Sequence, residues 1–195
     1  MKSDNIILAM LRIAAYAVLI VCWITWCLAF VKPQKTAAGS KKVMRAPWSR
    51  WGIFFVFLGF AGVWAFVQPE GFEKPAASLM ASMVVGPPSV ALAWAATRHL
   101  GRHWRFEAAL SQDHELIRSG PYRWLRHPIY ASMFGMLLQT GLVKAWWPLF
   151  LAGVVFYLIG TEIRVRAEDR LLAARFGTEF ERYKRATRAY IPFIR

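Results

Sequence analysis

The most constraining feature of this sequence is an uncharged run at residues 13–31, "IAAYAVLIVCWITWCLAFV". A helix needs about 20 predominantly apolar residues to cross the hydrocarbon core of a bilayer, which is about 30 Å thick. The run meets that requirement, and it lacks the small-residue cleavage site of a signal peptide. It therefore predicts a transmembrane helix that is retained in the protein.

Four further apolar runs follow, at residues 51–67, 76–97, 128–143 and 145–161. The chain is 57% hydrophobic and contains ten tryptophans, which makes it more apolar than an ordinary soluble domain of its length. We predict an all-α, polytopic membrane protein with five transmembrane helices.

Lysine and arginine are concentrated in alternate loops, and this pattern predicts the orientation of the chain. The loop after the first run, the segment before the fourth run and the tail after residue 161 are rich in basic residues. The loop between the second and third runs and the hairpin turn at Lys144 carry few. Because basic loops face the cytoplasm, the N-terminus is expected outside and the C-terminus in the cytoplasm. The net charge of +14 lies in these loops, so it indicates contact with anionic membrane lipids and not with nucleic acid.

The chain divides into two halves at residue 97. Residues 1–97 hold three plain transmembrane helices. Residues 98–195 form the candidate catalytic half, with an interfacial segment at 98–116, a helical hairpin at 128–161 that turns at Lys144, and cytoplasmic C-terminal helices. The helix of the fifth run is expected to continue to Gly177, a natural C-cap, and Thr178 and Glu181 predict a capping box for a last short helix.

The third run is interrupted by Gly86, Pro87 and Pro88 at the expected middle of the membrane. Prolines there remove backbone donors and kink a helix. The kink could widen a cavity between helices and admit a substrate, or it could be a local irregularity of packing, and the sequence favours neither.

Two polar groups flank the predicted hairpin and are the best candidates for chemistry. Arg164 and Glu168 lie four residues apart on one helix and therefore share a face. An Arg126-His127-Pro128-x-Tyr130 turn precedes the fourth run. Each group alone is ordinary at a membrane boundary. Because a hairpin returns the chain to the side on which it began, both groups should meet at the cytoplasmic surface. A pocket there suits an enzyme with a water-soluble cofactor and a lipid-like substrate.

The ordered set of these motifs resembles the isoprenylcysteine carboxyl methyltransferase family of integral membrane methyltransferases. The resemblance covers residues 100–193, through "LGRHWRF", "DHELIRSGPYRWLRHPIYASMFG" and "RVRAEDRLLAARFGTEFERYKRATRAYIPF". Its core is Gly-x-Tyr-x-x-x-Arg-His-Pro-x-Tyr, followed by Arg-x-x-x-Glu-acid and then Phe-Gly.

The resemblance implies methyl transfer from S-adenosylmethionine to a carboxylate, in a cofactor pocket at the cytoplasmic end of the hairpin. It assigns Arg164 and Glu168 as catalytic residues, with Arg164 steering the acceptor carboxylate. No metal site is expected. Carried over by position, the cofactor-binding residues are His114, Leu116, Gly120, Tyr122, Arg126, His127, Pro128, Tyr130, Glu168 and Asp169.

Two departures from the family pattern keep other activities open. Asp169 stands where the family usually has a second glutamate, and Ala131-Ser132 follows the turn where a glycine is common. Membrane sterol and steroid reductases share a similar turn and acidic pair but use NADPH, and phospholipid N-methyltransferases methylate an amine. A non-enzymatic scaffold is the remaining class, although a transport role is disfavoured because the centres of all five runs are uncharged.

The substrate is expected to be a lipophilic small molecule or a lipidated protein that enters from the bilayer. Its accepting group could be a carboxylate, a thiol or an amine.

Overall fold

The computed structural model describes residues 2–31, 43–65, 69–101, 109–111 and 115–191. Within these residues the chain forms six α-helices, two three-residue strands and one 3₁₀ turn. The elements are α1 (Lys2–Leu28), β1 (Val43–Arg45), α2 (Ser49–Trp64), α3 (Ala76–Leu100), β2 (Ala109–Ser111), η2 (Gly120–Arg123), α4 (Pro128–Val143), α5 (Trp147–Phe176) and α6 (Thr178–Ala186).

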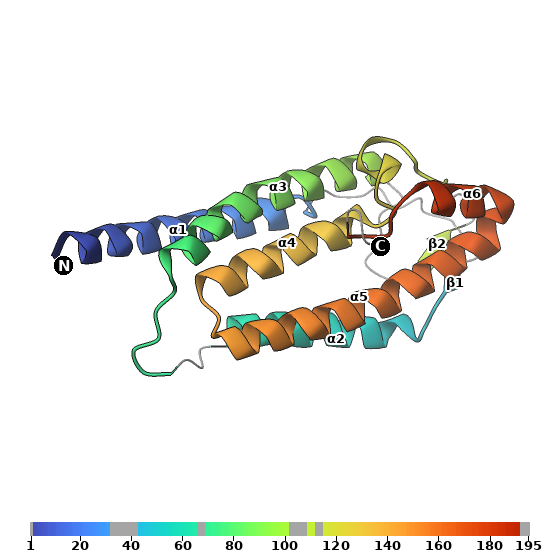
Figure 1. The fold of residues 1–195 in the computed structure, drawn as a ribbon. Coiled ribbons are helices and arrows are strands. Elements are labelled where there is room, and N and C mark those ends of the chain that lie inside the picture. Colours follow the sequence, from blue (N-terminus) through green and yellow to red (C-terminus); the bar gives the residue numbers. More distant parts are fainter. Residues whose placement is uncertain (1, 32–42, 66–68, 102–108, 112–114, 192–195) are drawn as a thin grey trace.

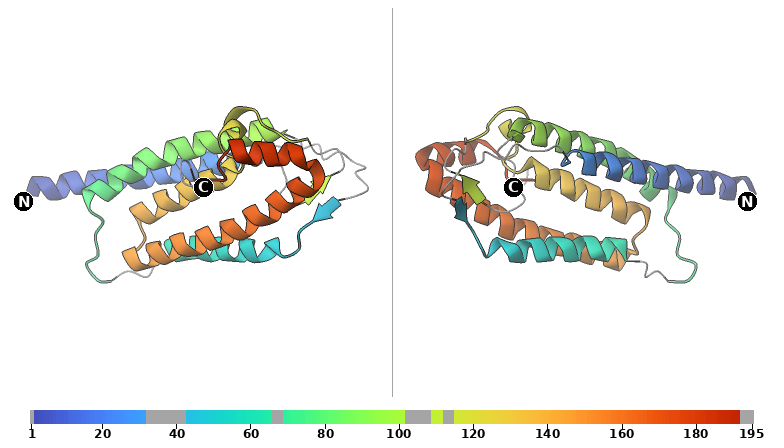
Figure 2. Two further views of the ribbon diagram at one scale, coloured as in Figure 1. Left: turned by 45° about the vertical axis from the view of Figure 1, so that its right-hand side comes forward. Right: turned by 180° about the vertical axis from the view of Figure 1, so that it is seen from behind.

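The helices form an elongated bundle in which α4 lies between two helix pairs (Figure 1). Helices α1 and α3 pack on one side of α4, and α2 pairs with α5 on the other, as both views in Figure 2 show. The start of α4, the last turns of α5 and all of α6 lie at the same end of the bundle. The hairpin therefore brings its two polar groups to one end, as the sequence predicted.

Three helices are long and apolar enough to cross a membrane, with candidate spans at Asn5–Leu28, Ala76–Leu100 and Trp147–Phe176. Helices α2 and α4 are apolar but have only 16 residues each. The expectation of a helical membrane protein is thus confirmed. Five membrane crossings are not confirmed, because only three of the described helices are long enough to span a bilayer. The fold is also not purely helical, because β1 and β2 pair antiparallel, with Met44 opposite Leu110.

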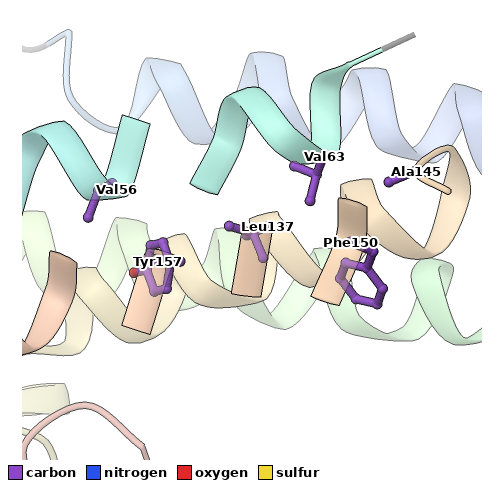
Figure 3. Close-up of a cluster of buried hydrophobic side chains, with 6 residues drawn as sticks. All are labelled: Val56, Val63, Leu137, Ala145, Phe150 and Tyr157. Atoms are coloured by element: carbon purple, nitrogen blue, oxygen red, sulfur yellow. The ribbon is translucent and has the colours of Figure 1, made fainter. Parts of the chain in front are cut away.

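An apolar core joins α2, α4 and α5 (Figure 3). Val56 and Val63 of α2 face Leu137 of α4 and Phe150 and Tyr157 of α5, and these side chains are almost completely buried. The ring of Tyr157 stacks on Phe134 and its hydroxyl donates to the carbonyl oxygen of Tyr130 over 2.6 Å. This core holds the two arms of the hairpin at a fixed spacing near the site.

The hairpin follows the predicted boundaries closely. Helix α4 spans the expected residues 128–143, and α5 continues past residue 161 to Phe176, where Gly177 ends it with a φ of 51°. The predicted capping box is wrong. Gly177 itself is the N-cap of α6, Thr178 is already the first helical residue, and no side chain caps the helix.

Helix α3 runs without interruption through Pro87 and Pro88. A Cβ on Gly86 would lie only 2.2–2.6 Å from the amide group of Gln139 on α4. The two helices are thus closely packed at this level, which favours the packing interpretation of the Gly-Pro-Pro segment over a widened cavity.

Helix α1 is joined to α4 by two tryptophan hydrogen bonds. The indole of Trp23 donates to Thr140 over 3.0 Å, and that of Trp26 donates to Ser132 over 3.2 Å. The buried hydroxyl of Thr140 also donates to the carbonyl oxygen of Met136 within its own helix. These bonds fix α1, which otherwise presents mostly apolar side chains, in rotation about its axis.

Replacing Thr140 with valine should destabilise the protein, because the partly buried indole of Trp23 would lose the acceptor of its N–H between two apolar helices. We expect a loss of about 1 kcal/mol, which corresponds to roughly 2–4 °C in melting temperature for a chain of this size. The measurement is thermal unfolding in detergent. Thr97→Val is the matched control, since Thr97 donates only to carbonyls of its own helix. Equal effects of the two substitutions would contradict the role given to Trp23.

Candidate functional site

The turn before α4 is shaped by glycine and proline. Gly120 opens the 3₁₀ turn with a φ of 57°, and a Cβ there would lie 2.4 Å from the ring of His99. Only glycine adopts that backbone conformation without strain and fits that space. Pro128 occupies the first turn of α4, where a missing N–H leaves no hydrogen bond broken. The chain between them is thereby directed toward α5 and α6.

The backbone of this turn pairs with the segment that follows α6. The N–H groups of Arg126 and His127 donate to the carbonyl oxygens of Arg188 and Ala189 over 2.8 Å, and Arg188 donates back to Trp124 over 3.0 Å. Two segments about 60 residues apart in sequence thus form a short parallel bridge. His127 is held at its place by main-chain bonds on both sides.

His127 lies between the two acidic residues of α5. Its Nδ1 is 3.2 Å from Oε2 of Glu168, and its Nε2 is 2.9 Å from Oδ1 of Asp169. The imidazole is almost fully buried, with 5% of its side chain exposed. Since carboxylates can only accept hydrogen bonds, both ring nitrogens must donate, and this requires the imidazolium form.

The electrostatics agree with that assignment. Burial alone would lower the pKa of His127, but hydrogen bonds to Asp169 and Glu168 and the charges of both carboxylates outweigh it and raise the pKa to about 9. At neutral pH the histidine is therefore a fixed cation and hydrogen-bond donor. It cannot serve as a general base there.

Arg164 reaches the same cluster from one turn earlier on α5. Its Nε donates to the hydroxyl of Tyr130 over 2.5 Å, and its Nη2 lies 3.3 Å from Oε1 of Glu168. The Tyr130 hydroxyl donates in turn to the same Glu168 oxygen. The guanidinium also lies 5.6 Å from the centre of the Tyr130 ring. Tyr130 thus links the arginine of α5 to the start of α4.

Arg126 points away from this arrangement and toward α6. Its Nη1 donates to the carbonyl oxygens of Thr187, over 2.5 Å, and Lys184, over 3.1 Å, at the end of that helix. Its Nη2 lies 3.5 Å from Oδ2 of Asp169. In this structure Arg126 ties the C-terminus of α6 to the acidic pair, a position that also complements the helix dipole.

The structure brings six of the predicted site residues into one cluster and leaves the others around it. The cluster consists of Arg126, His127, Tyr130, Arg164, Glu168 and Asp169. Gly120, Pro128 and Tyr122 shape the adjoining turn, and Leu116 is half-buried in the chain leading to it. His114 lies outside the described residues.

One contributor was missed by the sequence analysis. Tyr183 of α6 donates its hydroxyl to the carbonyl oxygen of Tyr122 over 2.6 Å, and it is buried with its pKa raised to about 12, chiefly by burial. Its position in a charged stretch, "EFERYKRATR", gives no sign of this packing. Nothing in the residue pattern alone would have identified it.

The cluster can bind and orient charged groups. It combines three cationic side chains with two carboxylates, so it carries one net positive charge at neutral pH. Glu168 is its most exposed acid, with 25% of its side chain accessible, against 10% for Asp169. The described cluster contains no thiol, and its histidine is protonated, so we assign it a chemistry of positioning and charge.

Comparison with known proteins bears on this same region. Residues 81–174 match the model of the isoprenylcysteine carboxyl methyltransferase family. The match includes all six cluster residues, whereas α1 and α2 lie outside it. The resemblance read from the sequence motifs is therefore confirmed.

Individual relatives have varied descriptions. An uncharacterized protein, YpbQ, of Bacillus subtilis is 30% identical over 73 residues, which are 37% of this chain and 44% of that protein. The protein-S-isoprenylcysteine O-methyltransferase of Saccharomyces cerevisiae is 36% identical over 83 residues, 42% of this chain and 34% of the relative. The cobalt-zinc-cadmium resistance protein CzcN of Cupriavidus metallidurans is 33% identical over 82 residues, 42% of this chain and 37% of the relative. The chain thus matches less than half the length of each.

Because the pKa of His127 is raised, we expect the protein to become less stable as the pH rises above neutral. A protonated His127 stabilises the fold fully below its unfolded pKa of about 6.5, and this contribution is lost as the pH rises through about 9. We expect the melting temperature in detergent to fall between pH 7 and pH 10, with a loss on the order of 3 kcal/mol at most.

His127→Gln should be less stable at pH 7 and should show a shallower fall over the same range. Tyr130, Glu168 and Asp169 contact the ring and are unchanged in this comparison. Parallel curves for the two proteins would show that His127 is not the titrating group.

Proposed function

We propose that this chain, whose residues 81–174 belong to the isoprenylcysteine carboxyl methyltransferase family, moves a methyl group from S-adenosylmethionine to the carboxylate of a lipid-like substrate of the isoprenylcysteine type. The observation that carries the proposal is the cluster itself. The residues of the family motif, separated by about 40 positions in sequence, form one buried ionic network around His127. A scaffold would have no need for so many buried charges in one place.

The proposal places the active site at the cytoplasmic face of the membrane. Helices α1, α3 and α5 cross the bilayer, and the shorter α2 and α4 complete five spans with the N-terminus outside. The lysine and arginine pattern supports this orientation. The cluster then lies where a water-soluble cofactor and a membrane-dissolved substrate can both approach.

The residues of the cluster fit S-adenosylmethionine by their donor set. Glu168 already accepts from Tyr130 and Arg164 on one oxygen and from His127 on the other. A carboxylate offers about four lone-pair positions, so this partly exposed acid retains capacity for one more donor, such as a hydroxyl or amino group. The ring of Tyr130, which already attracts the guanidinium of Arg164, is an aromatic face of the kind that favours a cationic sulfonium. Glu168 and Tyr130 are the residues assigned to hold the cofactor.

The positive excess of the cluster suits a carboxylate acceptor. Arg164 is held rigidly by Tyr130 and Glu168, and its guanidinium is the cation we assign to orient the acceptor. When bound, S-adenosylmethionine would supply an electrophilic methyl group, and Glu168 and Tyr130 would hold it beside the acceptor that Arg164 orients. Because a carboxylate is already ionised at neutral pH, the reaction needs no general base. A histidine that is held as a cation, and so cannot act as a base, is compatible with such a reaction.

The first test of the proposal is calorimetric binding of S-adenosylmethionine and its demethylated product to the detergent-purified protein. We expect the wild type to bind both ligands and Glu168→Gln to bind them at least tenfold more weakly, because the amide lowers the negative charge and changes an acceptor into a donor. Glu162→Gln is a matched control on the same helix. Glu162 pairs with Arg166 at 2.7 Å and has a similar exposure, 23% of its side chain.

The other outcomes separate the alternatives. Binding of NADPH instead of S-adenosylmethionine would move the protein to a reductase. Methylation of an amine-bearing lipid instead of a prenylated cysteine would retain the cofactor and overturn the acceptor. A folded wild type that binds neither cofactor would overturn the enzyme proposal as a whole.

A further inference from the structure

Helix α2 lies outside the region that matches the family, yet it touches the candidate site through Gly52. This glycine is buried against α5, between Gly160 and Arg164, which are one helical turn apart. A Cβ built on Gly52 would lie 2.6 Å from Cγ of Arg164, 2.7 Å from the carbonyl oxygen of Gly160 and 3.2 Å from the backbone nitrogen of Arg164. The α2 backbone therefore forms the wall against which the arginine side chain lies.

The contact constrains the side chain that we assign to orient the acceptor. The aliphatic stem of Arg164 has several rotatable bonds, and its productive direction is marked by the 2.5 Å bond from Nε to the Tyr130 hydroxyl. With the stem pressed on Gly52, a rotation of its first bonds toward α2 is blocked by backbone atoms. The guanidinium is left directed toward Tyr130 and Glu168.

We propose that Gly52 is a positioning residue for Arg164, and that its missing side chain sets the direction from which the arginine meets an acceptor carboxylate. The carboxylate part of this inference rests on the proposed function. The contact between Gly52 and Arg164 does not. Any side chain at position 52 should displace the arginine stem, separate α2 from α5, or do both.

Gly59 provides the internal comparison. It lies two turns further along α2 and approaches α5 equally closely, since its Cβ would be 2.7 Å from the carbonyl oxygen of Gly153 and 2.9 Å from the nitrogen of Tyr157. Both glycines thus permit close helix packing, as small residues do between membrane helices. Only Gly52 touches the side chain of a cluster residue. Gly59→Ala therefore reports the packing effect alone.

The first experiment is a double-mutant cycle in thermal unfolding, which needs no ligand. Gly52→Ala and Gly59→Ala should each lower the melting temperature of the detergent-purified protein. In an Arg164→Ala background the arginine Cγ is gone, so the fall caused by Gly52→Ala should be smaller by at least about 2 °C. The fall caused by Gly59→Ala should be the same in both backgrounds. Equal falls for Gly52→Ala in both backgrounds would overturn the inference.

The second experiment reads the direction of Arg164 through its preference for a negative charge. The probes are N-acetyl-S-farnesylcysteine and its methyl ester, bound in the presence of the demethylated cofactor. We expect the wild type and Gly59→Ala to prefer the acid over the ester by a similar ratio. In Gly52→Ala the acid-to-ester ratio should fall about tenfold, while the cofactor affinity stays within about twofold of the wild type. Arg164→Ala should show at least the same fall in the ratio.

The two experiments fail in distinguishable ways. An unchanged acid-to-ester ratio in Gly52→Ala, in a wild type that shows the preference, would overturn the positioning role. A wild type that binds the cofactor but shows no preference for the acid would overturn the carboxylate acceptor of the proposed function, and the unfolding cycle would still decide whether Gly52 positions Arg164.

Discussion

The buried imidazolium of His127 is the interaction on which the polar end of the helix bundle depends. It is held between Glu168 and Asp169, and a buried charge of either sign is tolerated only with such partners. The same two carboxylates hold Arg164 and Arg126, so α4, α5 and the end of α6 meet at one point. Removing any one of these charges would deprive another buried charge of a partner.

The apolar part of the bundle supplies the precision that the charges need. Lipid offers helices no hydrophobic reason to associate, so α2 and α5 are held by close contact of Gly52 with Gly160 and of Gly59 with Gly153. This packing fixes the axial position of α5, and hence the level at which Arg164 leaves the helix. The site thus lies between the closely packed pair α2 and α5 and the turn before α4, which is fixed by main-chain hydrogen bonds to residues 188–189.

Much of this arrangement follows from local sequence rules. Pro128 and Gly177 mark helix ends, and the spacing of Arg164 and Glu168 places them on one face, so the hairpin and most of the cluster could be predicted. The prediction of a capping box was wrong because Gly177, with its positive φ, is both the C-cap of α5 and the N-cap of α6. The β1–β2 pairing and the contact of Gly52 with α5 depend on distant partners. No local pattern records such contacts.

The geometry shows what an aspartate at position 169 does. Asp169 reaches both Nε2 of His127 and Nη2 of Arg126 with its short side chain, and it remains nearly buried. Glu168 is longer and more exposed, and it carries Tyr130 and Arg164 at the accessible edge of the cluster. The two acidic residues therefore have different structural roles. Asp169 fixes the turn and α6, and this leaves Glu168 as the carboxylate that can face a ligand.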